Sequence, residues 1–365
     1  MISFLLSLLI PLLLSPGVMA HEAWILTPEQ VAQWSTRPKP EVFTQLNATS
    51  AAIYLVTAVA LFGCLLLHRW TRSRLLFSRL EAFVASYREY VTLALRVVLF
   101  ILLSMACLGL APRAGTGHMQ NPVLVVPDLE LHQVSGNWTW LAVAEGLLAL
   151  CFLLGIYVRG AAAMLVGLSL LGLVLFGKAM AAYIGLVGAA AVYLLLRGAG
   201  PYALPLPSIS GTAKLCAVLA GQPMERAQWL LRVLVGANLL YLGLEYKFRQ
   251  PNLMLGVIEV AHVPTLGMEP GTLVLWMAVV ETLSGVLILT GVLVRPLSIG
   301  LFFAFVFFSM VVGEGVFSHI IFYGLLVPLI INGAGRWQAP LSADIPGCHM
   351  IPGRQIARVQ PEHCN

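Results

Sequence analysis

Few residues of this chain are charged, and the short motifs of many soluble enzymes are missing from it. Only 10% of its 365 residues are Asp, Glu, Lys or Arg. The sequence has no glycine-rich phosphate-binding loop, no GxSxG turn, no HExxH helix and no CxxC pair. These absences argue against nucleotide hydrolysis of the P-loop type, serine hydrolase chemistry, HExxH zinc proteolysis and thioredoxin-like redox exchange.

Cysteine and histidine are also scarce. None of the six cysteines lies in a loop that we expect on the outer side of a membrane, so no structural disulfide is predicted there. Only His319 lies in a predicted spanning helix, which argues against a haem held by two histidines of one chain. The basic residues fall between apolar runs and form no continuous groove, so no nucleic-acid partner is expected.

Apolar sequence, in contrast, is abundant. Hydrophobic residues make up 59% of the chain, and the mean hydropathy is +0.89, far from the balance of a soluble domain. A spanning helix needs about 20 largely apolar residues. We therefore predict an all-α polytopic protein of the lipid bilayer, with nine transmembrane helices at residues 50–67, 91–111, 138–158, 160–177, 179–197, 229–245, 272–294, 296–313 and 316–332.

One stretch of the chain occurs twice. Trp276–Arg295 (WMAVVETLSGVLILTGVLVR) aligns without a gap with Trp140–Arg159 (WLAVAEGLLALCFLLGIYVR), and the two copies share a tryptophan, a glutamate, a glycine and the final arginine. A repeat of this kind indicates a duplicated structural unit. Each copy holds four of the predicted helices, so both would enter the bilayer in the same direction, as parallel repeats at 91–197 and 229–335.

The remaining segments flank these repeats. Residues 1–20 are predicted to be a signal peptide, because an apolar core is followed by Pro-Gly and by small residues before the expected cleavage site. Most of the 21 Lys and Arg residues then fall on the side of the C-terminus, which places the mature N-terminus outside and the C-terminus inside. The other predicted segments are an exported segment at 21–49, a first transmembrane helix with an Arg-rich loop at 50–90, a linker at 198–228 with a short interfacial helix near 211–220, and a tail at 336–365.

Glu281 and Glu145 occupy the same place in the two copies, inside apolar helices. An ionisable side chain within a membrane is costly, so it normally faces a bundle interior, a cavity or a partner. Two interpretations are open for both residues. Each is either a structural carboxylate that accepts hydrogen bonds, or a residue that contacts a substrate or quinone and handles protons.

The second copy has four further polar residues near its predicted outer end: Glu245, Lys247, Glu314 and His319. Together with Glu281 they would form a polar pocket, in which Lys247 partners a carboxylate and His319 exchanges protons near neutral pH. The alternative is an ion-pair network that only closes the bundle. In the first interpretation Glu281 and His319 are the candidate catalytic residues.

Two places combine metal-ligating residues. Cleavage of the signal peptide would make His21 the N-terminal residue, whose amino group and imidazole together can bind copper. The tail holds the pairs Cys348-His349 and His363-Cys364, whose thiolates and imidazoles suit tetrahedral zinc. Neither place has the ligand spacing typical of known sites, so an exposed N-terminus and a disordered tail are the alternatives.

The stretch from Arg232 to Asp344 resembles the DoxX/DoxD family of four-helix membrane proteins. The resemblance rests on RVLVGANLLYLGLEYKF, VVETLSGVLILTGVLVRP and GAGRWQAPLSAD, and residues 96–207 resemble the family more weakly. It implies a bundle in a bacterial inner membrane and, by analogy with the thiosulfate:quinone oxidoreductase large subunit of this family, a place beside the quinone pool. The family pattern maps most directly onto Glu245, Lys247, Glu281 and Arg295.

Three functions are open at this point. The first is a quinone-associated subunit of the inner membrane, active in periplasmic electron transfer or sulfur-compound oxidation with redox partner subunits. The second is a non-catalytic accessory or assembly subunit, with copper handled through His21. The third is a transporter of small molecules or metals.

Overall fold

The computed structural model of this chain describes residues 25–72, 83–113, 117–134, 136, 138–204, 213–265, 267–312 and 316–335. Within these residues the chain is nearly all helical, and seven helices are long and apolar enough to cross a membrane. The prediction of an all-α multi-pass membrane protein is thereby confirmed. The predicted signal peptide, His21, Glu314 and the tail with its two Cys/His pairs lie outside the described residues.

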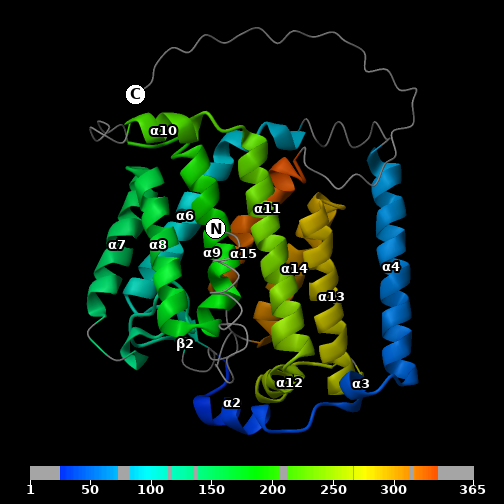
Figure 1. The fold of residues 1–365 in the computed structure, drawn as a ribbon. Coiled ribbons are helices and arrows are strands. Elements are labelled where there is room, and N and C mark those ends of the chain that lie inside the picture. Colours follow the sequence, from blue (N-terminus) through cyan, green and yellow to red (C-terminus); the bar gives the residue numbers. More distant parts are fainter. Residues whose placement is uncertain are drawn as a thin grey trace.

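Two groups of helices stand side by side in the molecule (Figure 1). The first bundle consists of α6 (Val91–Cys107), α7 (Thr139–Leu154), α8 (Val158–Phe176) and α9 (Lys178–Arg197). The second bundle consists of α11 (Met224–Tyr241) with its π-helical continuation η3 (Leu242–Phe248), α13 (Pro270–Thr290), α14 (Val294–Val312) and α15 (Ile320–Asn332). The chain therefore passes through the bundles in the order in which the apolar runs occur.

Two of the predicted spans form shorter helices than expected. The run at 138–158 gives α7 with 16 residues, and the run at 316–332 gives α15 with 13 residues after a 3₁₀ turn, η4 (Val316–His319). Both are shorter than the length of about 20 residues that a straight crossing requires. α7 ends because Gly155 adopts a left-handed φ of 71°, a conformation that glycine takes without steric cost.

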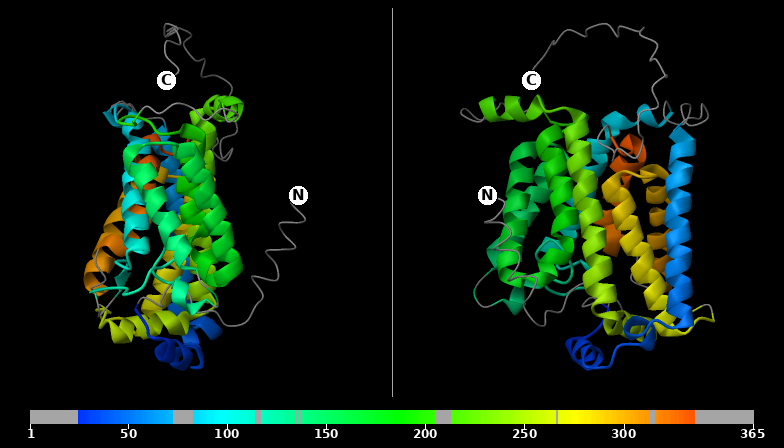
Figure 2. Two further views of the ribbon diagram at one scale, coloured as in Figure 1. Left: turned by 90° about the vertical axis from the view of Figure 1, so that its left-hand side faces the viewer. Right: turned by 45° about the vertical axis from the view of Figure 1, so that its right-hand side comes forward.

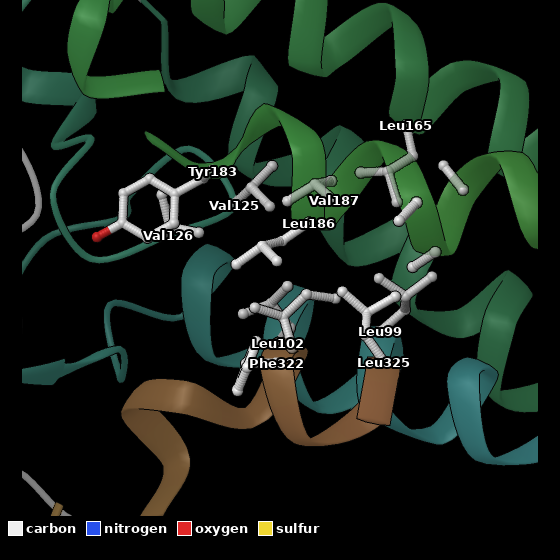
Figure 3. Packing of buried hydrophobic residues seen from close by; sticks show 14 of the residues in the cluster. Leu99, Leu102, Val125, Val126, Leu165, Tyr183, Leu186, Val187, Phe322 and Leu325 are labelled. Atoms are coloured by element: carbon white, nitrogen blue, oxygen red, sulfur yellow. The ribbon is translucent and has the colours of Figure 1, made fainter. Parts of the chain in front are cut away.

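The two bundles pack through four helices, because α9 lies against α11 and α6 lies against α15. Asn238 of α11 joins the first pair: its amide donates to the Ala182 carbonyl at 2.9 Å, and its oxygen accepts from the Gly185 N–H at 3.1 Å. The largest apolar core runs through both contacts. Figure 3 shows part of this core, with side chains from α6, α9 and α15: Leu99, Leu102, Leu186, Phe322 and Leu325.

Short helices cover one end of the second bundle, which we call the α12 end. They are α2 (Pro28–Ser35), α3 (Glu41–Thr44) and α12 (Pro251–Val260), and Figure 1 shows them together. Trp34 of α2 packs on Gly256 of α12, and the Arg37 guanidinium lies 3.6 Å from the centre of the Trp34 ring. No helix is predicted from the sequence at 251–260, because ten residues are too few for a membrane span.

Two helices and one small sheet complete the fold. α4 (Ala48–Arg72) begins and ends beyond the predicted 50–67 and stands at the edge of the molecule, against α13 and α3 (Figures 1 and 2). α10 (Ala213–Ala220) lies across the opposite end of the molecule from α12, near the predicted 211–220 (Figure 1). The strands have two residues each and pair antiparallel in the loop after α6: β1 (Pro112–Arg113) and β2 (Gly117–His118).

Candidate functional site

The candidate site lies around η3, where the first helix of the second bundle changes from α-helical to π-helical geometry. The backbone N–H of Arg249 donates to the Leu244 carbonyl at 3.0 Å, a bond that spans five residues. Short π-helical segments within α-helices are rare and occur frequently at functional sites. In this chain the segment carries Glu245, Tyr246 and Lys247.

Lys247 forms an ion pair with Glu281 of α13. Both side chains are largely buried, with 12% and 11% of their surface exposed. Glu281 lies near the middle of α13 rather than close to its end. The pairing of Lys247 with a carboxylate is one of the contacts that the sequence suggested, and the carboxylate is the one shared by both sequence copies.

Glu245 pairs with two other cations. Its carboxylate lies 3.6 Å from Nζ of Lys178 and 3.1 Å from the Arg249 guanidinium. Lys178 begins α9 of the first bundle, is 6% exposed, and its carbonyl accepts a hydrogen bond from the Tyr246 hydroxyl at 3.1 Å. The site therefore spans both bundles. Lys178 is not among the residues that the sequence predicts for the site, although a lysine directly after Gly177 and between two apolar runs is a signal that points to it.

His319 belongs to a different pair of helices. Its Nδ1 lies 3.1 Å from Oγ of Ser309 on α14, and the same Oγ lies 3.3 Å from the Tyr323 hydroxyl on α15. The ring of Phe305 packs against the imidazole with a centroid distance of 5.1 Å. The contacts described for His319 are thus with α14 and α15, whereas Lys247 and Glu281 contact each other between η3 and α13.

Glu145 has surroundings unlike those of Glu281. It is fully buried in the first bundle, and one carboxylate oxygen accepts the Val125 N–H at 2.6 Å. Among the described residues Glu145 has no ion pair with a Lys or Arg side chain. The two glutamates that are aligned in sequence therefore differ in the kind of group that they contact.

Arg295 contacts the backbone of its own bundle. Its guanidinium donates to the carbonyls of Ile330 and Ile331 near the end of α15, at 3.1 and 3.4 Å. Arg159 makes the equivalent pair of contacts in the first bundle, with carbonyls near the end of α9: Leu195 at 3.2 Å and Leu196 at 3.5 Å. Arg295 lies at the start of α14, so these hydrogen bonds join the start of α14 to the end of α15.

No metal centre is evident in the described part of the chain, where no three His, Cys, Asp or Glu side chains gather closely enough to hold an ion. The predicted copper and zinc ligands are all outside the described residues. Comparisons of the chain with protein-family models, with curated proteins and with solved structures found no match. The geometry around η3 is therefore the feature of the described residues that bears on function.

Proposed function

We propose that this protein is a quinone-associated membrane subunit that takes part in electron transfer or in the oxidation of sulfur compounds. The observation that carries the proposal is the pair of buried ionic contacts on η3: Lys247 with Glu281, and Glu245 with Lys178. Charged side chains inside a membrane are rare and mark pathways for substrates, ions or protons. A π-helical segment at the same place favours a functional role over a purely structural one.

The chemistry of these residues suits a quinone. Reduction of a quinone takes up electrons and protons at its two ring oxygens, and oxidation of the quinol returns them. In the proposed site the Lys247 ammonium donates a hydrogen bond to one ring oxygen, and Glu281 exchanges the proton of that oxygen. The second proton is exchanged between the other ring oxygen and water. Both side chains have a partner in the resting protein, so the ionic pair holds them in place until the ligand arrives. The electrons come from a redox partner subunit, which the proposal requires.

The proposed architecture has two tandem DoxX-like units and nine crossings, with α7 and α15 counted as short spanning helices. Matched arginines support the duplication. Arg96 packs against Gly155, where a Cβ would lie 2.5 Å from its Nη2 atom, and Arg232 packs against Gly291 in the same manner. Both glycines are left-handed ends of the second helix of a bundle. The same side-chain and backbone arrangement in both bundles is expected of repeated units.

The proposed setting is a bacterial inner membrane, with the α12 end on the periplasmic side and α10 and the tail on the cytoplasmic side. The excess of Lys and Arg in the segments next to α10 supports this orientation. In this setting η3 lies near the periplasmic end of the second bundle, in contact with α12. A periplasmic or membrane-bound electron donor would then reach the site from the side that α2 and α12 cover.

The test is quinone turnover with the purified full-length protein and its co-purifying subunits. Glu281→Gln should lower the rate roughly a hundredfold, the size of effect expected for loss of a group that transfers protons. Glu145→Gln is the matched control, because it makes the same change at the aligned position of the first bundle. Equal rates for the wild type and Glu281→Gln would remove the proposed site. Mass spectrometry of extracted lipids should also find a quinone bound to the wild-type protein.

A second candidate function is that of an accessory subunit, and the α12 end favours it. Residues of α2 and α12 form an apolar cluster that is joined to the second bundle through Val274 of α13, so the N-terminal segment is docked on the end of that bundle. The Arg37 guanidinium adds an ion pair with Glu259 at 3.9 Å. An accessory role predicts co-purification with a larger complex that Trp34→Ala disrupts, without quinone turnover by the chain itself.

A further inference from the structure

A second membrane-buried carboxyl group, in the first bundle, is independent of the site around η3. Glu145 lies on α7 with none of its surface exposed, and apolar residues of the same helix beside it are also buried: Leu141, Ala142, Leu148 and Ala149. Its position makes contact with bulk water impossible in this conformation. Any hydrogen bonds that replace those of water must therefore come from groups of the protein.

The hydrogen bonds that Glu145 receives are too few to stabilise a negative charge. Oε1 accepts the Val125 N–H at 2.6 Å, while Oε2 is buried and has no hydrogen-bond partner among the described residues. The titratable group on the adjacent α6 is the Cys107 thiol, which would lie 3.6 Å from a Cβ on Gly146 and which donates a hydrogen bond to the Ser104 carbonyl at 3.3 Å. The loop at 123–130 has two acidic residues, and each has a partner of its own: Asp128 accepts a hydrogen bond from the Tyr183 hydroxyl of α9, and Glu130 lies 3.1 Å from Nδ1 of His132. Among the described residues, no cationic side chain forms an ion pair with Glu145.

The free energy of burial differs between the charged carboxylate and the neutral carboxylic acid of Glu145. Transfer of an isolated carboxylate into an apolar interior costs far more than the loss of one hydrogen bond by a neutral carboxyl group. A group in this situation binds a proton instead of remaining charged. Glu281 shows the contrast within the same chain, since Lys247 neutralises its charge directly.

We infer that Glu145 is a proton-binding site, held as a neutral carboxylic acid while the aligned Glu281 is a carboxylate. The loop at residues 123–130 covers this proton. Val125 adopts a left-handed φ of 64°, which is strained for a β-branched residue, and its N–H is the one bound to Glu145. The hydrogen bond to the carboxyl group thus holds the strained turn in place. Exchange of the proton with water requires this loop to move.

Infrared spectroscopy of the full-length protein in liposomes tests the inference. The wild type should show the carbonyl stretching band of a protonated carboxyl group in an apolar site. Glu145→Gln should lose this band, and Glu281→Gln should keep it. Because an amide retains the oxygen that accepts the Val125 N–H, Glu145→Gln preserves the loop contact. No such band in the wild type, or its loss in Glu281→Gln alone, would overturn the assignment.

A labelling experiment on the wild-type protein tests the protonation of Glu145 without any substitution. Dicyclohexylcarbodiimide is an apolar reagent that takes the proton of a neutral carboxyl group and forms an acylurea with it. Peptide mapping by mass spectrometry should find the label on Glu145 and an unlabelled Glu281. Label on Glu281 with none on Glu145 would contradict the inference. The outcome is separate from that of the quinone assay, which measures turnover and not the protonation of Glu145.

Discussion

The two bundles hold the same glutamate in different ways. In the first bundle Glu145 accepts a hydrogen bond from a backbone N–H, whereas in the second bundle Glu281 forms an ion pair with the Lys247 ammonium. The cause lies in the preceding helix of each bundle. α6 ends at Cys107 and the chain turns into a loop, whereas α11 continues as η3 and carries a lysine to the level of the carboxylate. The two aligned glutamates thus contact different groups, because the neighbouring helix ends differently in each bundle.

The helix pairs that carry these glutamates also pack differently. In the second bundle α11 and α13 meet at Gly236 and Gly285, so closely that a Cβ on Gly285 would lie 2.6 Å from the backbone nitrogen of Leu240. The aligned positions of the first bundle hold Phe100 and Ala149. Close approach of two backbones brings η3 against α13, which is the contact that joins Lys247 to Glu281.

The largest effect on stability should come from Glu281→Gln. This change leaves the buried Lys247 ammonium without its counter-charge, and loss of one partner of a buried pair costs about 3–5 kcal/mol. Glu145→Gln should cost about 1 kcal/mol or less, because the amide replaces a neutral acid and still accepts the Val125 N–H. Thermal unfolding in detergent micelles measures both.

A double variant sharpens this comparison. Lys247→Met combined with Glu281→Gln removes both charges, so it should unfold at a higher temperature than Glu281→Gln alone. Equal destabilisation by Glu281→Gln and Glu145→Gln would mean that the two glutamates are in the same charge state after all.

A smaller effect is expected at the helix crossing of the second bundle. Gly285→Ala places a methyl group against backbone atoms of α11, which must shift at a cost of about 1–3 kcal/mol. Gly146→Ala on α7 is the matched control, since its Cβ would meet the Cys107 sulfur at an ordinary 3.6 Å. The melting temperature should fall for the first variant only. A fall of similar size for Gly146→Ala would refute the difference in packing.

The smallest effect should follow from Lys178→Met. Glu245 then keeps Arg249, which lies 3.1 Å away, so the loss should be roughly 1 kcal/mol. A cross-link between cysteines introduced on α9 and η3 would report whether the two bundles separate at this point. Destabilisation as large as that of Glu281→Gln would show that Arg249 does not compensate for Lys178.

Much of the architecture could be predicted from apolar runs alone. Helices such as α8 and α9 are long and largely apolar, with charged residues only near their ends, so length and hydropathy locate them. α12 was not predicted, because its ten residues are too short to be recognised as a membrane span. η3 was not predicted either, because the amino-acid composition of a π-helical turn does not differ recognisably from that of an α-helix. Partners such as Lys178 for Glu245 were equally hidden, since they come from different bundles.

By itself, the sequence determined that the chain crosses a membrane repeatedly, that a stretch with one glutamate occurs twice, and that polar residues accumulate in the second copy. These properties are local, since apolar length and the spacing along a helix need no knowledge of neighbours. Only the tertiary structure decided that Glu281 receives a lysine and Glu145 a backbone amide, and that His319 lies with Ser309 and Tyr323. The reason is that the partner of a buried charge depends on where adjacent helices end and how closely they pack.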